Sequence, residues 1–154
     1  MSEDEKVILA IRVRGQARVR PQIEDTLDKL LLGRVHQARI IKTTPSMQGM
    51  ITKAKDFITW GVPSEEVIEK LLTKRGRLPG NAHLTDAYVK KNSSHSSVKA
   101  LAKAIASGKA SVSDVEGLKP VFRLTPPTKG FKGKRNVPVG MGGITGDRGE
   151  SISE

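Results

Sequence analysis

The sequence predicts an α+β protein built on an antiparallel three-stranded sheet with two helices on one face. Residues 6–14, 37–42 and 58–62 have the apolar alternation or the short apolar runs of strands. Residues 21–32 and 45–58 repeat apolar side chains at helical spacing. The order is therefore strand, helix, strand, helix, strand. Two helices covering one face of the sheet make a split, ferredoxin-like arrangement the most economical one.

The first strand predicts where positive charge gathers. Its first half is apolar on both faces, which is typical of a central strand, and its second half places arginines on one face. Gly15 ends the strand, and the loop that follows carries two more arginines. Four cations are thus expected at one end of the sheet, where they are candidates for phosphate contacts: Arg12, Arg14, Arg18 and Arg20.

The first helix begins at Pro21 and is closed by Gly33, with its apolar stripe toward the sheet. Acidic residues in its first turns suit the positive end of the helix dipole. The second strand, at residues 37–42, carries two cations that project from it, Arg39 and Lys42.

The stretch from Thr43 to Ile58 is the most informative part of the chain. Thr44 is a good helix N-cap, and Pro45 fits the first helical position. The apolar stripe is Met47, Met50, Ile51, Ala54 and Ile58, whereas Lys53 and Lys55 lie mostly away from it. Gly49 costs this helix about 1 kcal/mol relative to alanine. Either the helix packs tightly on the sheet at Gly49, or a nucleic-acid backbone lies against it.

Residues 62–127 read as a mostly helical extension. Helices are expected at 63–76 and from Ser97 to about Ser107, with one turn at 86–90. Ser113 and Glu116 match a capping box for a further short turn. Residues 121–124 are expected to form a strand, which either joins the sheet or makes a ribbon with the loop around Arg77.

Residues 128–154 read as a basic, Gly-rich C-terminal tail. The segment contains seven glycines and no core-forming periodicity, so it cannot bury enough surface to fold alone. Four cations occur before Gly146 with no acid among them: Lys129, Lys132, Lys134 and Arg135. The tail is either floppy or an arm that becomes ordered on a nucleic acid. The chain thus divides into a core at 1–61, the extension at 62–127 and this tail.

The composition favours a polyanionic partner. The formal net charge is +11, and residues 6–61 carry eleven Lys and Arg against four acids. Such a surface binds polyanions because each neutralised phosphate releases condensed counterions. A protein that is merely basic is the alternative that composition leaves open. Cysteine is absent, no apolar run reaches the length of a membrane span, and the acidic start is not a signal peptide, so we expect a cytoplasmic protein.

The sequence holds no pattern typical of an enzyme. The glycine run at 140–146 lacks the Lys and hydroxyl ending, and the strand and helix, of a phosphate-binding loop. His36, His83 and His95 have no metal-like spacing. Ser93, Ser94 and Ser96 adjoin His95 in the sequence, but adjacency in sequence does not provide the geometry of a catalytic triad. We therefore expect no catalytic residue, no metal, no cofactor and no small-molecule substrate.

The aromatic residues are too few and too scattered for recognition by base stacking. Phe57 and Phe122 are expected in the core, and Trp60 is either a core residue or a stacking residue. Recognition of a nucleic acid would then depend on Arg and Lys contacts to phosphates and on the shape of a folded RNA.

Residues 39–55 resemble the signature of the large-subunit ribosomal protein thirty family, whose eukaryotic relatives are called large-subunit protein seven. The most specific part is Thr44-Pro45, followed by Gly49-Met50-Ile51 and by Lys53 and Lys55. The strand, basic loop and helix upstream, and the residues 57–61 downstream, stand where that family has them. Residues 117–127 and the Gly/Lys tail resemble the longer archaeal form.

The resemblance implies a structural protein of the large ribosomal subunit that binds rRNA near the 5S rRNA and contacts other ribosomal proteins. The residues expected at the RNA are Arg12, Arg14, Arg18, Arg20, Arg39, Lys42, Gly49, Lys53, Lys55, Lys129, Lys132, Lys134 and Arg135. Gln48 stands where the family often has a basic residue, so no phosphate is assigned to it. A free-standing RNA-binding or regulatory protein with the same fold is the alternative.

Overall fold

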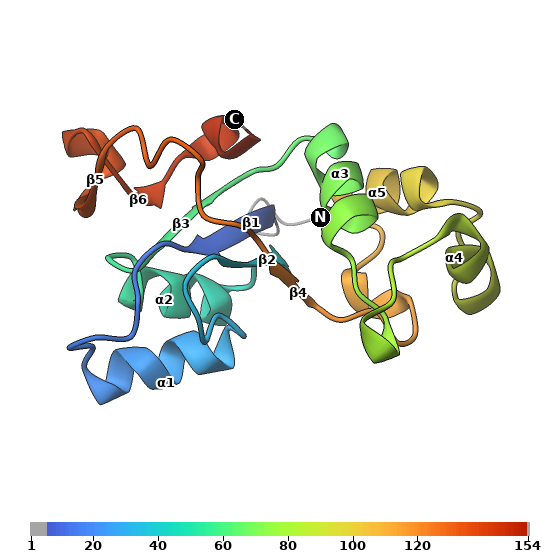
Figure 1. The fold of residues 1–154 in the computed structure, drawn as a ribbon, viewed down its shortest axis with the longest axis horizontal. Coiled ribbons are helices and arrows are strands. Elements are labelled where there is room, and N and C mark those ends of the chain that lie inside the picture. The colour runs from blue at the N-terminus through green and yellow to red at the C-terminus, as the bar shows by residue number, and fades with distance from the viewer. Residues whose placement is uncertain (1–5, 154) are drawn as a thin grey trace.

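A computed structural model describes residues 6–153 and gives an α+β fold with one mixed sheet of six strands (Figure 1). The strand order is β4-β2-β1-β3-β6-β5. The bounds are Val7–Arg12 for β1, Gln37–Lys42 for β2, Ile58–Gly61 for β3, Val121–Arg123 for β4, Lys134–Pro138 for β5 and Gly143–Asp147 for β6. The three strands predicted from the sequence form the antiparallel centre, where β1 pairs with β2 on one side and with β3 on the other.

Local capping signals set where most helices begin. The α-helices are α1 at Pro21–Lys29, α2 at Pro45–Lys53, α3 at Glu65–Arg75, α4 at Asp86–Asn92 and α5 at Val98–Ala106. Thr44 caps α2 as predicted, since its hydroxyl accepts the N–H of Met47 at 3.3 Å. Hydroxyl side chains cap α3, α4 and α5 in the same way. Such a cap contributes about 1 kcal/mol to each helix.

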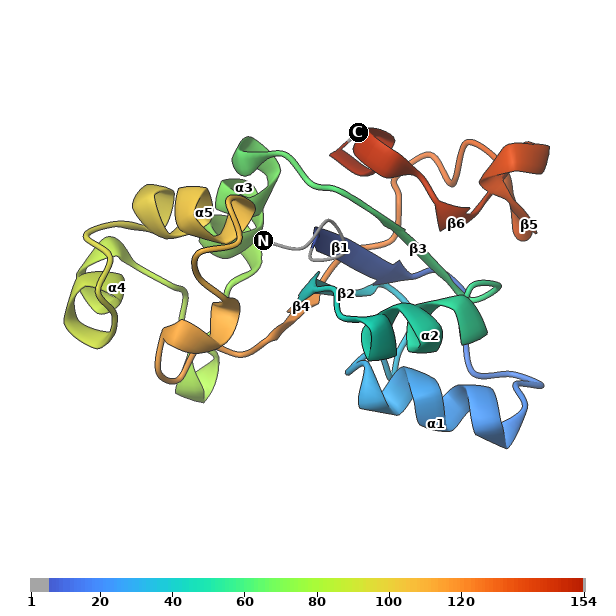
Figure 2. The same ribbon diagram turned by 180° about the vertical axis from the view of Figure 1, so that it is seen from behind.

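The central sheet is covered on both faces. Ile8, Ala10 and Ile41 pack with α1 and α2 in one apolar cluster. Leu9 and Ala38 point the other way and pack with α3, α5 and the rest of the extension in a second cluster. Figures 1 and 2 show the two helix groups on different sides of the strands. This arrangement explains why the first half of β1 is apolar on both faces.

The sheet is larger than the three strands predicted. β4 joins it by pairing antiparallel with β2, where Ala38 lies opposite Phe122. The alternative ribbon between residues 121–124 and the loop around Arg77 is wrong, because Arg77 instead forms an isolated bridge with His83. Phe122 is fully buried, so its ring anchors this edge strand to the second cluster.

The C-terminal segment also differs from its prediction, because β5 and β6 form within residues 128–154. β6 pairs parallel with β3, and β5 pairs parallel with β6. The guanidinium of Arg148 donates to Thr59 Oγ1 at 2.9 Å, which ties the segment to β3. A Cβ at Gly143 would overlap the carbonyl of Val137, so the glycine allows the two backbones to approach. The glycine content led us to predict a tail, but at Gly143 the missing side chain allows two strands to pair.

Two boundaries in the structure differ from those predicted from the sequence. The capping box uses Ser111 and Asp114, so it lies two residues before the predicted pair Ser113 and Glu116. Helix α1 ends at Lys29 rather than near Leu32, because Leu31 adopts a left-handed φ of 58°. Neither change moves a residue expected at the RNA.

Candidate nucleic-acid interface

The loop after β1 and the turn before β3 lie together at one end of the molecule (Figures 1 and 2). Arg12 pairs with Ile58, so the chain leaves β1 beside the point where it enters β3. The guanidinium of Arg14 lies 4.7 Å from the ring centroid of Phe57 and donates to the carbonyl of Asp56 at 3.3 Å. These contacts bring cations of the loop close to the end of α2.

Five cations share this end, and we name them the loop–helix patch: Arg14, Arg18, Arg20, Lys53 and Lys55. All are exposed except Arg14, which is partly exposed. Neither ion pair found among the described residues involves a member of the patch. Their charges are therefore available to a polyanion, and the cation–π contact of Arg14 leaves its charge in place.

Gly49 stands on the exposed face of α2. A Cβ built on it would meet no atom within 4 Å outside the helix's own backbone and its neighbours, so tight packing on the sheet is not the reason for a glycine here. The apolar stripe behaves as predicted, with Ile51 and Ala54 buried on the opposite face. Residues three and four positions away on a helix are surface neighbours, which for Gly49 include Ser46, Thr52 and Lys53. The helix thus presents bare backbone between two hydroxyls and an ammonium group.

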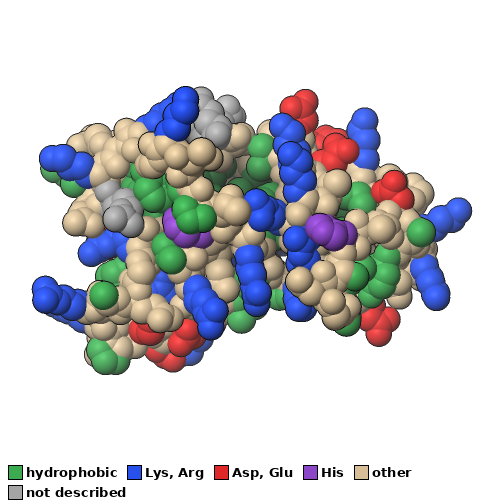
Figure 3. Space-filling view, viewed as in Figure 1, with side chains coloured by type: hydrophobic (Ala, Val, Ile, Leu, Met, Phe, Trp, Pro, Cys, Tyr) green, Lys and Arg blue, Asp and Glu red, His purple; other side chains and the backbone are tan. Residues whose placement is uncertain are grey.

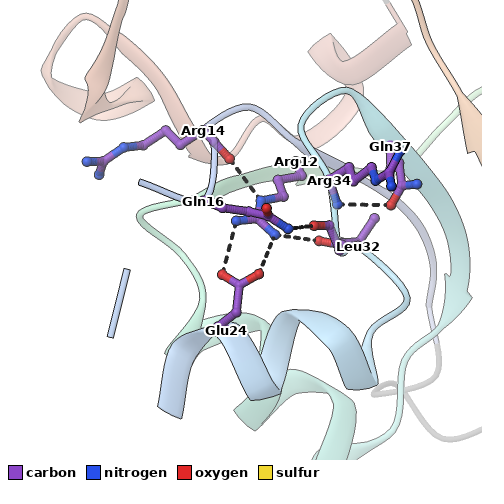
Figure 4. Close-up of polar contacts among 8 residues, drawn as sticks. Arg12, Arg14, Gln16, Glu24, Leu32, Arg34 and Gln37 are labelled. Atoms are coloured by element: carbon purple, nitrogen blue, oxygen red, sulfur yellow. Dashed lines mark hydrogen bonds and ion pairs between the residues drawn. The ribbon is translucent and has the colours of Figure 1, made fainter. Parts of the chain in front are cut away.

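Among the predicted contacts whose side chains the structure describes, Arg12 is the one that is buried away from the surface. Its side chain is fully buried, and its guanidinium pairs with the Glu24 carboxylate of α1 at 3.3 Å. The same guanidinium donates to the carbonyls of Leu32, at 2.9 Å, and Arg14, at 2.8 Å (Figure 4). Arg12 therefore holds α1 to the end of β1 and is withdrawn from the proposed contacts.

The two cations of β2 differ in exposure. Arg39 is partly buried, and its guanidinium donates to the carbonyl of Leu30 at the end of α1 at 3.2 Å. Burial removes water from this group and thereby lowers the pKa of Arg39 below its ordinary value. Lys42, at the end of the strand, is exposed. Arg39 therefore offers less surface to an RNA than Lys42 does.

The tail cations lie on the same side of the protein as the loop–helix patch. Lys129, Lys132 and Lys134 are exposed, while the side chain of Arg135 lies outside what the structure describes. Asn136 of β5 shares a hollow of about 180 Å³ with three residues of the loop, Arg14, Gly15 and Ala17. Residues more than a hundred positions apart thus meet here, which sequence spacing alone does not reveal.

The aromatic residues differ in how deeply they are buried. Phe122 is fully buried as expected, but Phe57 is only partly buried and carries Arg14 over its ring. Trp60 packs against the α1–α2 cluster and also lines a hollow of about 420 Å³ beside α2. Trp60 is therefore both a packing residue and a wall of a surface hollow.

Positive charge forms two groups on the face drawn in Figure 3. Lys and Arg side chains project from the end that carries the loop–helix patch, and others form a band across the middle, near β4 and α3. Acidic side chains gather near α1 and α3. Near β4 and the end of α3, four cations line one hollow and were not among the predicted contacts: Arg75, Arg77, Lys119 and Arg123. They come from segments that lie far apart in the sequence.

Among the side chains that the structure describes in residues 6–153, no group of three or more His, Asp or Glu is suited to a metal ion. None of the helices in this range combines the length and the apolar composition that crossing a membrane requires.

Comparison with known proteins gives a consistent result. A family model described as ribosomal protein L30p/L7e matches residues 8–58. A protein of Methanosphaera stadtmanae named large ribosomal subunit protein uL30 is 49% identical over 94% of this chain and 93% of its own length. Proteins of the same name from Methanobrevibacter smithii and Methanocella arvoryzae are 44% and 42% identical, over 96% and 93% of this chain and the same shares of their own lengths.

Proposed function

This chain belongs to the ribosomal protein L30p/L7e family, and we propose that it binds rRNA through the loop–helix patch and the open face of α2. It is a structural constituent of the large ribosomal subunit, acts in the cytoplasm as part of the ribosome and is not an enzyme. The relatives reported above are all named as large-subunit proteins, which gives no support to a free-standing regulator. A position near the 5S rRNA is part of the proposal and rests on the family resemblance.

The observation that carries the proposed interface is the open surface over Gly49. An alanine at position 49 would meet no other group and would favour the helix. The stability of the free protein alone therefore favours alanine over glycine at this position. A nucleic-acid backbone lying on α2 supplies a reason for the missing Cβ, because glycine lets a partner approach the main chain closely. The neighbouring hydroxyls and Lys53 suit hydrogen bonds to phosphate and sugar oxygens.

The tail cations extend this interface in our proposal. Asn136 of β5 lines one hollow with Arg14 of the loop–helix patch, so an RNA lying on the patch can also contact β5, which begins at Lys134. Lys129 and Lys132 precede the strand in a segment without regular structure, which suits an arm that becomes ordered on RNA. The extension at 62–127 has a structural task as well, because its helices cover the second face of the sheet.

Replacing Gly49 with alanine tests the interface. We expect Gly49→Ala to raise the free energy of unfolding by about 0.5–1 kcal/mol, because alanine favours the helix and the methyl group meets nothing. We expect the same change to weaken binding to large-subunit rRNA several-fold. Thermal melting and filter binding measure the two effects separately.

Gly140→Ala is the matched control, because a Cβ there also meets no atom within 4 Å and the position lies outside both α2 and the loop–helix patch. It should leave rRNA affinity unchanged. A Gly49→Ala protein that is more stable and binds rRNA as tightly as the parent would remove α2 from the interface.

A further inference from the structure

The extension carries a basic pocket at the junction of α3, the loop after it and β4. The pocket encloses about 200 Å³, and we name it the extension pocket; its walls are Arg75, Arg77, Asn81, Lys119, Val121 and Arg123. Four of these six residues are cations and none is an acid. Figure 3 shows a band of Lys and Arg side chains across the middle of the molecule, where Figure 1 draws β4 and α3.

Two of the pocket's three arginines donate hydrogen bonds to neutral groups. Arg77 donates to Nδ1 of His83 at 2.8 Å and to the carbonyls of Lys74 and Gly76 at 3.3 Å. Arg75 donates to the hydroxyl of Thr125 at 3.4 Å. The two ion pairs formed among the described residues are Arg12 with Glu24 and Lys29 with Asp25, so no described carboxylate neutralises the pocket. Arg12 shows the contrast, since its charge is balanced by Glu24.

The backbone around the pocket is tied together. The N–H of Lys119 donates to the carbonyl of Arg77 at 3.0 Å, and the N–H of Leu78 donates to that of Ala82 at 2.8 Å. β4 fixes Arg123 opposite Gln37 of β2. The pocket is therefore pre-arranged, and a ligand need not order the chain before binding.

We propose that the extension pocket binds a phosphate group of the RNA backbone, as a second docking point in addition to the loop–helix patch. Guanidinium groups bind phosphate oxygens with paired, charge-assisted hydrogen bonds, and the three arginines that line this small pocket suit that geometry. The proposal rests on the proposed rRNA function. An acidic segment of a neighbouring protein is the competing ligand, but the small volume suits a compact anion better than a peptide.

The two docking points are separate. β3, which the patch adjoins, and β4, which lines the pocket, are three strand spacings apart in the sheet, or about 14 Å. Figures 1 and 2 draw the loop after β1 at one end of the molecule and α3 nearer its middle. One phosphate group cannot reach both, so the pocket requires a different nucleotide or a different RNA segment.

The test uses the full chain with two charge-matched variants. Arg75→Gln/Arg123→Gln removes two charges from the pocket, and Lys70→Gln/Lys99→Gln removes two from the groove between α3 and α5, which three glutamates also line. The measurement is affinity for large-subunit rRNA across a salt series. The pocket variant should lose about tenfold in affinity at low salt and reduce the salt slope by one to two. The control should change neither quantity.

Equal effects of the two variants would overturn the proposal, because the pocket would then act only through net charge. A pocket variant that lowers the melting temperature is replaced by Lys119→Gln, whose exposed side chain makes no hydrogen bond within the described residues; this variant should reduce the slope by about one. A variant that keeps rRNA affinity but loses an association with another ribosomal protein would assign the pocket to a protein ligand instead. If the unmodified chain does not prefer rRNA to random RNA, the proposed function itself has failed, which is a different outcome.

Discussion

Replacing Arg12 with methionine is expected to lower the free energy of unfolding by about 3 kcal/mol without weakening RNA binding. The change leaves the Glu24 carboxylate without its cation and the carbonyl of Leu32 without its buried donor. Breaking a buried ion pair costs about 3–5 kcal/mol, and the lower end applies because Glu24 is 27% exposed. For a chain of this length the melting temperature should fall by roughly 10 °C.

The control for this prediction is Arg18→Met, in the loop that follows β1. Arg18 is exposed, so its replacement should leave the melting temperature almost unchanged and weaken rRNA binding instead. Calorimetry and rRNA binding below the melting transition separate the two roles. If Arg12→Met kept its stability and lost affinity, the buried role assigned to Arg12 would be wrong.

Removing charge from the loop–helix patch is expected to have the largest effect on RNA binding. The variant replaces four cations with glutamine, Arg14, Arg18, Lys53 and Lys55. We expect affinity for rRNA at low salt to fall on the order of 100-fold, because each charge-assisted phosphate contact contributes to binding and releases a counterion. The slope of log affinity against log salt concentration should become shallower by about three.

The matched control removes four exposed charges from the extension: Lys90, Lys91, Lys103 and Lys109. Both variants have the same net charge, so a non-specific electrostatic contribution affects them equally. A control that loses as much affinity and slope as the patch variant would show that the patch is not a binding surface. Circular dichroism of both variants checks that the fold is kept.

Signals within a few residues of one another were sufficient to predict the helices of the core. The threonine before Pro45 predicts the start of α2, and the Thr44 hydroxyl indeed accepts the N–H of Met47. The apolar positions on both faces of β1 predict a central strand, and β1 lies between β2 and β3. These features depend on backbone chemistry and periodicity alone, so one sequence contains them.

Features that depend on distant partners could not be predicted. Arg12 and Arg14 both alternate with apolar residues, so periodicity does not show which of the two is buried. Arg12 is buried where its guanidinium pairs with Glu24 of α1. β6 is short and rich in glycine, and it exists because β3 offers an edge at Thr59 and Trp60. The extension pocket likewise combines the end of α3 with β4 across more than forty residues.

The most direct test of the central claim is binding of the purified chain to large-subunit rRNA and to random RNA of equal length across a salt series. We expect a clear preference for rRNA that persists at physiological salt, together with an affinity that falls steeply as salt rises. Equal affinity for both RNAs at every salt concentration would contradict it, because the basic surfaces would then act as a non-specific polycation.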